Sequence, residues 1–327
     1  MTPSARARAG AAALAVALLA PGCAGTRTTA GDSTLPGQPM IAQAALRGAA
    51  TVPDSLAGQF AVYDGEGHPA TPEDVAAAMA RVDVVFLGEL HDDAIGHALQ
   101  HWLLQRAIHG AGSRPVALGL EMFERDAQLI LDEYLAGAIR ERDFLVAARP
   151  WSDYARFYRP LVETAREAGA AVLATNAPAR YVNLVAREGA GGLAATPAAR
   201  RILPRLPVAP ASPALAAKFE ALMSEMPAHG SVGPTMAGLL AAQNLRDASM
   251  ASFIARWLGY NGSGLVVHAN GSFHSEGGLG IPEHLARYRP RARTLVVTFR
   301  RTDDPAVAPA PSPGDDFVIV TRRAAGE

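Results

Sequence analysis

The sequence predicts an α/β domain with a mostly parallel central sheet flanked by helices. Apolar, strand-like runs alternate with helix-length segments, which is the order that builds a parallel sheet. Four of these runs end on side chains able to ligate a metal or move a proton: Glu89 and His91, Glu121, Asn176, and His268 and His274. Because ligands bind beyond the carboxyl ends of the strands in such sheets, we expect these segments to assemble one site.

The elements of the first half follow in the order strand, helix, strand, helix. A helix is predicted over 71–82, with Thr71 as its N-cap and Glu73 and Asp74 in its first turn. Ser152 is predicted to cap the helix that Trp151 opens. The other elements expected here are strand 82–87, helix 94–110, strand 115–120, helices 124–137 and 140–147, helix 151–170, strand 170–175 and helix 178–188.

A proline-rich segment over 196–213 interrupts this alternation. Helices are expected after it over 213–226 and 234–258, so we interpret 196–260 as a helical insertion that covers one side of the sheet. The domain closes with strands over 264–269, 294–299 and 316–321, of which the last two could form an antiparallel edge hairpin. The globular body is therefore expected to span 56–327.

The first 23 residues are predicted to be a lipoprotein-type signal peptide. Two arginines precede an apolar run that ends at Gly22 and Cys23, and this run is too short to span a bilayer as a mature helix. We predict lipidation of Cys23; a plain secreted protein with an incidental cysteine is the alternative. Residues 24–55 have the composition of a flexible tether. Because Ala24 is not aspartate, we expect a lipid anchor in the outer membrane, facing the periplasm.

Composition excludes several classes of protein. Cys23 is the only cysteine, so the body has no disulfide framework and no thiolate metal site. The formal net charge is −1, lysine is almost absent and the arginines are scattered, which leaves no basic stripe for nucleic acid. We therefore expect no nucleic-acid partner.

Two G-x-x-H motifs, 88–91 and 271–274, each follow an apolar strand. Glycine lets the chain turn sharply there and lets a ligand approach the backbone, while the histidine projects into the crevice. A satisfied structural histidine is the competing interpretation of either motif. Glu89 and Glu121 end successive strands, and a desolvated carboxylate needs a metal, an arginine or a proton. A salt bridge with Arg180 or Arg246 is the alternative to a site role.

Three further groups are candidates for the same site. His97 and His101 share a helix face and could ligate a metal or contact a porphyrin edge, although His101 could instead point to solvent. Gln243, Arg246 and Asp247 lie on one face of a predicted helix. This face either caps the site or is solvated. An aromatic cluster lies at Trp151, Tyr154, Phe157 and Tyr158. It either packs in the core or supplies a tyrosinate as a haem ligand.

Taken together, these residues resemble the ChaN-type haem-binding lipoproteins, which share a wider superfamily with the erythromycin esterases and the Tiki/TraB proteins. The resemblance covers about 60–300. It rests on GELHDDAIGH (88–97), EMF (121–123), WSDYARFYRP (151–160), ATNAP (174–178), QNLRDASMA (243–251) and GSFH (271–274).

The resemblance implies an extracytoplasmic, membrane-anchored protein that binds haem for iron uptake. Its expected partners are haem, an outer-membrane haem receptor and, around the haem, a second copy of the chain. With no basic cluster for the propionates, Arg180 and Arg246 would have to serve. The residues implied in haem binding are His91, His97, Tyr154, Tyr158, Asn176, Arg180, Arg246 and His274.

The wider superfamily implies an alternative, metal-dependent hydrolysis of a peptide or an ester. A divalent metal held by His91, His274 and one glutamate would activate a water molecule, and the other glutamate, Glu89 or Glu121, would act as general base. A third alternative is an envelope scaffold without activity. The haem-binding and hydrolase hypotheses both require Glu89, His91, Glu121 and His274 to meet in space.

Overall fold

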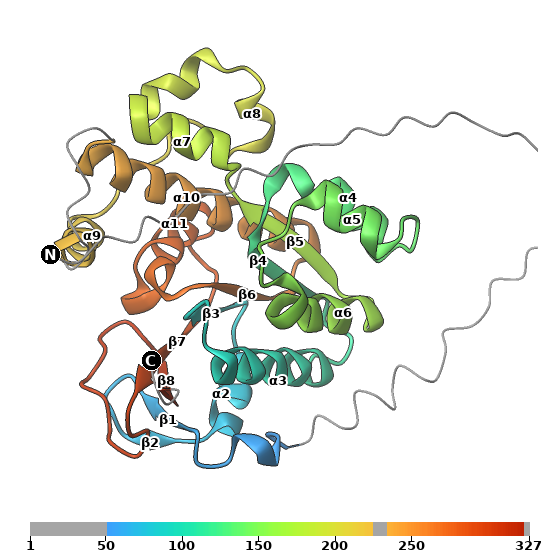
Figure 1. The fold of residues 1–327 in the computed structure, drawn as a ribbon, viewed down its shortest axis with the longest axis vertical. Helices are drawn as coiled ribbons and strands as arrows, with labels where there is room; N and C mark the ends of the chain where they lie inside the picture. The colour runs from blue at the N-terminus through green and yellow to red at the C-terminus, as the bar shows by residue number, and fades with distance from the viewer. Residues whose placement is uncertain (1–50, 225–233, 324–327) are drawn as a thin grey trace, which may run out of the picture. The chain divides into compact units, whose positions relative to one another are not determined.

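The computed structural model describes residues 51–224 and 234–323. The predicted signal peptide 1–23, with Cys23, and most of the tether 24–55 lie outside the described residues. The predicted α/β class is confirmed, since helices pack on both faces of one eight-stranded sheet (Figure 1). Its strands are β1 (Phe60–Asp64), β2 (Pro69–Ala70), β3 (Val84–Glu89), β4 (Val116–Glu124), β5 (Ala171–Asn176), β6 (Leu265–Gly271), β7 (Thr294–Thr302) and β8 (Phe317–Arg322).

The strands lie in the order β2-β1-β8-β7-β3-β6-β4-β5. Every pair from β8 to β5 is parallel, and β1 pairs antiparallel with both β8 and β2. The expected antiparallel edge is therefore present, but it is not made by the last two strands. β7 and β8 run parallel because the loop after Thr302 carries the chain back along the sheet before β8 begins. The edge pair β1–β2 was not predicted, since strands of five and two residues leave little periodic signal.

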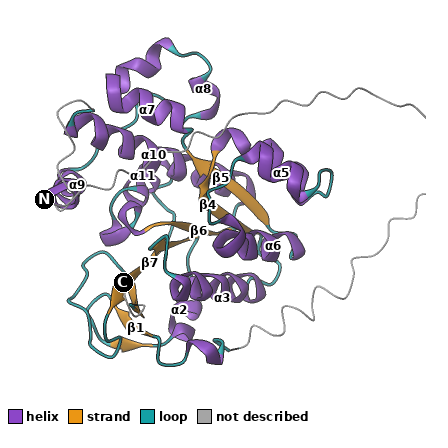
Figure 2. Cartoon of the chain, viewed as in Figure 1, coloured by secondary structure: helices purple, strands orange, loops and turns teal. Residues whose placement is uncertain are grey.

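Most helices begin and end close to their predicted boundaries. The helices over 199–202 and 281–288 were not predicted, because segments of four and eight residues leave little periodic signal. Figure 2 shows the helices in purple. Thr71 caps its helix as expected: its side chain accepts from the Asp74 amide, and the Asp74 carboxylate accepts from the Thr71 amide. The described helices are α2 (Pro72–Met79), α3 (Ala94–Gly110), α4 (Gln128–Leu135), α5 (Glu141–Ala148), α6 (Arg159–Glu167), α7 (Ala179–Glu188), α8 (Ala199–Ile202), α9 (Pro213–Ser224), α10 (Met236–Asn261) and α11 (Ile281–Tyr288). None of the helices in these ranges combines the length and apolarity needed to cross a membrane.

The helix expected from Trp151 begins differently. A π-helical turn occupies Tyr154–Tyr158 before α6 starts, and no side chain caps it, so Ser152 is not an N-cap. A π-turn carries one extra residue per turn, which changes the direction of the side chains that follow it, and such turns are frequent at functional sites. Here the turn contains Tyr158, which contributes directly to the site described below.

Strand alternation produces two cores. Val85 and Leu87 of β3 belong to a core that also contains residues of α2, α3, α4, α5 and α6, whereas Val84 and Phe86 belong to a core with residues of α10 and α11. In Figure 1, α3 and α6 lie on one side of the strands and α10 and α11 on the other. A third apolar cluster joins α7 and α8 to α10. The helices predicted over 213–226 and 234–258 are α9 and α10, and α10 covers one sheet face.

The outer edge of β5 is covered by side chains. Gln128 of α4 donates to the Val172 carbonyl and accepts from the Ala174 amide, at 2.8 Å each. Arg125 donates to the Ala174 carbonyl at 3.2 Å. These bonds occupy backbone groups that would otherwise attract another strand.

Candidate functional site

The carboxyl ends of β3, β6, β4 and β5 meet at one edge of the sheet. Pairing places Glu89, the last residue of β3, opposite Gly271, the last residue of β6. The pairing of β4 with β5 becomes irregular after Leu120, and Glu121 lies in that irregular stretch. Such irregularities redirect a side chain beside a site. The sequence places polar residues at or just beyond the end of each of these strands, and the parallel topology brings those ends together.

Glu89 forms one half of the site. It is 2% exposed, and its carboxylate accepts from Tyr158 Oη at 2.6 Å, Gln100 Nε2 at 2.8 Å and His91 Nδ1 at 2.9 Å. The hydrogen bond to Glu89 raises the pKa of His91, against the opposing effect of burial. Three donors therefore compensate the buried carboxylate, and His91 is the one among them that reaches solvent, with its side chain 51% exposed.

Glu121 forms the other half. Its carboxylate accepts from the Gly271 amide at 2.7 Å and lies 3.4 Å from His274 Nε2. On the opposite side of the ring, His274 Nδ1 donates to Asp247 at 2.5 Å. Burial opposes charge on all three side chains, but the two carboxylates raise the pKa of His274 to about 10. The same imidazolium overcomes the desolvation of Glu121 and lowers its pKa to about 2.

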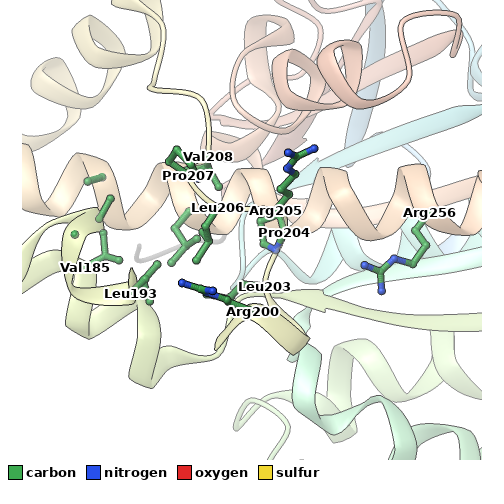
Figure 3. A pocket seen from close by; sticks show the side chains of 14 residues that line it. Val185, Leu193, Arg200, Leu203, Pro204, Arg205, Leu206, Pro207, Val208 and Arg256 are labelled. Atoms are coloured by element: carbon green, nitrogen blue, oxygen red, sulfur yellow. The ribbon is translucent and has the colours of Figure 1, made fainter. Parts of the chain in front are cut away.

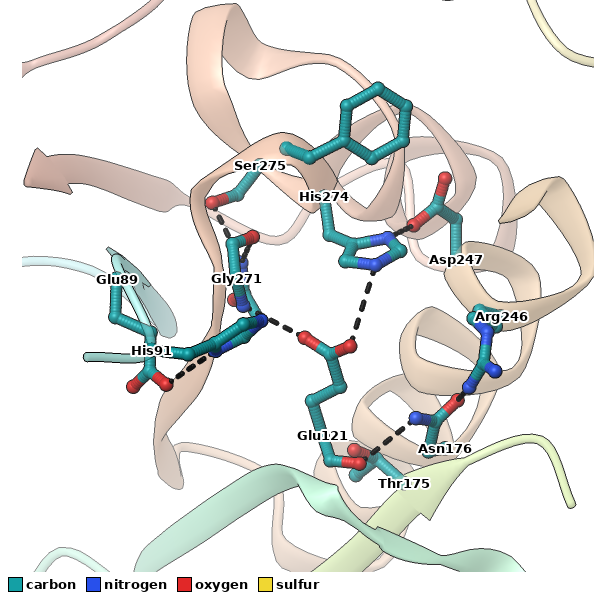
Figure 4. Close-up of polar contacts among 12 residues, drawn as sticks. Glu89, His91, Glu121, Thr175, Asn176, Arg246, Asp247, Gly271, His274 and Ser275 are labelled. Atoms are coloured by element: carbon teal, nitrogen blue, oxygen red, sulfur yellow. Dashed lines mark hydrogen bonds and ion pairs between the residues drawn. The ribbon is translucent and has the colours of Figure 1, made fainter. Parts of the chain in front are cut away.

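Gly271 joins the two halves. A Cβ atom built on it would lie 2.9 Å from His91 Cε1, 3.0 Å from His91 Nε2 and 3.7 Å from the Glu121 carboxylate. The glycine of the second G-x-x-H motif therefore makes room for the histidine of the first. The four groups required by the sequence argument, Glu89, His91, Glu121 and His274, therefore come together around Gly271 (Figure 4). Glu89, His91 and His274 also line a crevice, whereas Glu121 lies behind Gly271 and His274 and does not line it.

The crevice opens into a cavity of about 340 Å³. Polar groups of Glu89, His91 and His274 line one part of it, and an apolar wall of Phe219, Leu222 and Phe273 lines another. The rings of Phe219 and Phe273 pack against each other edge to face, with their centroids 6.1 Å apart. The wall comes from α9 and from the 3-10 turn Ser272–His274.

The remaining predicted residues divide into those beside the crevice and those away from it. Asn176 donates to the Glu121 carbonyl at 3.0 Å and accepts from Arg246 at 3.1 Å, so both lie beside Glu121. Arg180 instead pairs with Asp126 at 2.5 Å and stacks on Tyr181. Neither arginine forms the alternative salt bridge with a site glutamate.

The proposed haem-contact residues His97, Tyr154 and Tyr158 are all buried, at 5%, 3% and 1% exposure. His97 is held by Gln100 and by the His91 carbonyl and stacks on Phe157, so it supports the Glu89 side of the site. The Tyr158 hydroxyl is bonded to Glu89. Tyr154 packs into the aromatic core, and burial raises the pKa of both tyrosines, which disfavours tyrosinate. These three side chains do not fit direct contact with a ligand in the crevice.

His101 and His268 also have structural partners. His101 lies 2.8 Å from Thr164 Oγ1, so it does not point to solvent, and it does not reach the crevice. His268 is fully buried between Thr175 and Asn270, at 2.9 Å from each. Burial lowers the pKa of His268 to about 4, so this ring is neutral.

Sequence reasoning missed three contributors to the site. Gln100, one turn after His97 on α3, bridges that histidine to Glu89. Asp247 was expected on a helix face that either caps the site or is solvated, but its role as the partner of His274 was not predicted. Lys218 of α9, the single lysine of the chain, donates to the carbonyls of Phe273 and Glu276 at 3.1 and 3.0 Å. A single lysine in a chain whose other basic residues are arginines was a sequence signal that could have marked Lys218 as a candidate.

A tight metal-ligand cluster is not formed by the crevice groups as they stand. Among the described residues, the group of at least three side chains whose ligand atoms all lie within 4.8 Å of one another consists of Asp64, Glu66 and His68. These three lie in the exposed turn between β1 and β2, where His68 already bonds to Asp64 at 3.0 Å.

Fold and site together define an α/β domain with an imidazole- and carboxylate-lined crevice at the C-terminal edge of a parallel sheet. The chain belongs to the haem-binding uptake, Tiki superfamily, ChaN family, whose model matches residues 75–285. No curated protein sequence matches the chain significantly.

The solved structure of a ChaN protein shows the same fold, and others are more distantly similar. ChaN of Campylobacter jejuni, with cofacially bound haem, has a TM-score of 0.60 at 16% identity, covering 82% of this chain and 98% of that one. The type III effector HopBA1 has a TM-score of 0.47 at 11% identity, covering 78% and 95%. A mutant of the erythromycin esterase EreC in its open conformation has 0.45 at 13% identity, covering 81% and 83%.

Proposed function

We propose that the crevice binds haem as cargo for uptake and that His91 is the side chain that contacts the iron. The observation that carries this is the state of His91: half exposed, with Nδ1 held by buried Glu89 and Nε2 left for a ligand. A carboxylate on the far nitrogen fixes the orientation of a ligating imidazole and increases its basicity. Histidine is a common axial ligand of haem iron.

The cavity supports the same assignment. Its wall of Phe219, Leu222 and Phe273 offers an apolar surface opposite the imidazole, as ligand pockets commonly do. Arg246 lies at the Asn176 side of the site and is the better placed of the two arginines considered for a propionate. Haem bound cofacially in the ChaN of Campylobacter jejuni agrees with this ligand class.

Absorption spectroscopy with added hemin tests the proposal. We expect a shifted Soret band that saturates at a defined stoichiometry in the parent protein and is lost or strongly altered in His91→Ala. His68→Ala is the matched control, because His68 is 72% exposed and lies in the β1–β2 turn. Absence of saturable binding in the parent, or equal spectra for His91→Ala and the parent, would end this assignment.

One observation favours a second function, metal-dependent hydrolysis. His91 and His274 each bind a carboxylate through Nδ1. The Nε2 atom of His91 lies beside Gly271, and that of His274 lies 3.4 Å from Glu121. Carboxylate-braced histidines are typical of metal ligands. Glu121 would complete the ligand set, whereas Glu89, enclosed by three donors, suits a bracing role better than that of a base. Metal analysis after dialysis, with an esterase and peptidase screen, tests this; metal-free, inactive protein rejects it.

We also propose that the protein is lipidated at Cys23 and held at the outer membrane facing the periplasm, where it acts as a dimer beside a haem receptor. The signal-like residues 1–23 support this placement. The parent should incorporate labelled palmitate and Cys23→Ala should not. In membrane fractionation, the parent should be found with the membranes and Cys23→Ala should not. Equal labelling would reject lipidation at this cysteine.

A further inference from the structure

A second cavity lies apart from the crevice, between α7, α8 and α10. Its volume is about 810 Å³, and it shares no lining residue with the crevice (Figure 3). The floor is apolar and includes Val185, Leu193, Leu203 and Leu245, which are 1–3% exposed and belong to one hydrophobic cluster. The proline-rich segment after α8 forms part of the wall through Leu206.

The charged lining of this cavity has a single sign. Arg200, Arg205 and Arg256 line it, and no aspartate or glutamate does. All three arginines are exposed residues at the rim, above the buried leucines. Arg205 and Arg256 form no ion pair within the described residues. An apolar floor below a cationic rim is complementary to a molecule with an apolar body and an anionic group.

A second arginine, Arg125, lies beside the Arg256 end of the cavity, although it does not line the cavity itself. Arg256 and Arg125 both lie over the ring of Phe253, at 4.9 and 4.2 Å from its centroid. Burial and then the nearby Arg256 lower the pKa of Arg125, against the opposing charge of Asp132, as expected for two guanidinium groups that share one aromatic ring. An anion placed at this end would relieve that repulsion.

The shape of the cavity favours a chain over a compact ring system. Along α10 its lining extends from Ala241 through Leu245 to Arg256. At a rise of about 1.5 Å per residue, these positions span about 22 Å of helix. An extended apolar chain follows such a groove along its length, with its head group at one end.

We propose that this cavity binds a long-chain fatty-acid carboxylate, with the chain over Leu193 and Leu245 and the carboxylate at Arg256. The site is independent of the crevice, so this inference does not rest on haem binding. An extended chain with one terminal charge satisfies the apolar floor, the cationic rim and the length together.

The test is displacement of a fluorescent fatty acid from the full-length protein by oleate, with methyl oleate as the uncharged comparison. Oleate should compete and methyl oleate should be at least tenfold weaker, because the ester lacks the charge that Arg256 recognises. Gly191→Phe should block the chain without strain, since a Cβ on Gly191 meets nothing within 4 Å. Arg256→Gln should weaken oleate about tenfold.

His91→Ala should leave oleate binding unchanged, and thermal melts should show that each variant is folded. Three results would overturn the proposal: no displacement by oleate below its micellar concentration, equal competition by methyl oleate, or wild-type affinity in folded Gly191→Phe. Competition by hemin that Gly191→Phe abolishes would also overturn it, because the cavity would then be a porphyrin site.

Discussion

Replacing Glu121 by glutamine tests the charge arrangement in the crevice. Glu121 and His274 are both buried, and each depends on the other for compensation of its charge. Glutamine keeps the shape and can still accept from the Gly271 amide, but it removes the negative charge. His274 is then left with Asp247 alone.

The magnitude follows from the pKa shifts. The pKa of Glu121 is lowered from 4.5 to about 2, because His274 and the Gly271 amide outweigh the desolvation that burial imposes. At about 1.4 kcal/mol per pKa unit, the charge contributes on the order of 3 kcal/mol to the free energy of unfolding. The raised pKa of His274 describes the same pair from the other partner and is not added. Removing one member of a buried pair costs about 3–5 kcal/mol, which agrees.

The sign of the pH dependence is fixed by the two shifts. Because the pKa of Glu121 is lowered on folding, its contribution is present above pH 4.5 and is lost as the pH falls toward 2. Because the pKa of His274 is raised on folding, its contribution is present below pH 6.5 and is lost as the pH rises toward 10. The pair therefore stabilises the fold most between these limits, near pH 5.5.

Urea unfolding of chelator-treated protein at pH 5.5, 7 and 8.5 measures the effect. We expect Glu121→Gln to lower the free energy of unfolding by about 3 kcal/mol at pH 5.5, with a smaller difference from the parent at pH 8.5. Glu220→Gln is the matched control, since Glu220 is exposed on α9. A loss below about 1 kcal/mol at pH 5.5, or a pH profile parallel to the parent, would refute the reasoning.

Three further substitutions separate function from packing. Gly271→Ala should displace the His91 ring, which would lie 2.9 Å from the new methyl group, and alter the hemin spectrum as His91→Ala does; an unchanged spectrum would contradict the geometry. Tyr154→Phe removes a buried hydroxyl that has no partner, so thermal stability should hold or rise and the hemin titration should not change. A lower thermal stability would show that the hydroxyl has a hydrogen-bond partner, and an altered hemin titration would restore a ligand role for Tyr154. Lys218→Met should accelerate amide hydrogen exchange in 271–278 about tenfold, because two carbonyl bonds are lost, and unchanged exchange would show that Lys218 does not hold this loop.

The alternation of apolar runs and helical segments was enough to predict the parallel sheet and most helix boundaries. Each run is buried on both faces, so its hydrophobic signal is continuous and strong. The edge strands β1 and β2 lack that signal and were missed. The direction of β8 could not be predicted either, because a loop without periodicity decides where the chain re-enters the sheet.

The site divides in the same way. Strand-end position alone predicted that Glu89, His91, Glu121 and His274 would converge, because parallel topology collects the carboxyl ends of strands at one edge. Which histidine stays exposed depended on partners distant in sequence: Tyr158, placed by a π-turn, Gln100 on α3 and Asp247 on α10. These contacts join segments up to 69 residues apart around Glu89 alone, and no local pattern records them. The sequence determined which groups meet, and packing decided which of them remain available to a ligand.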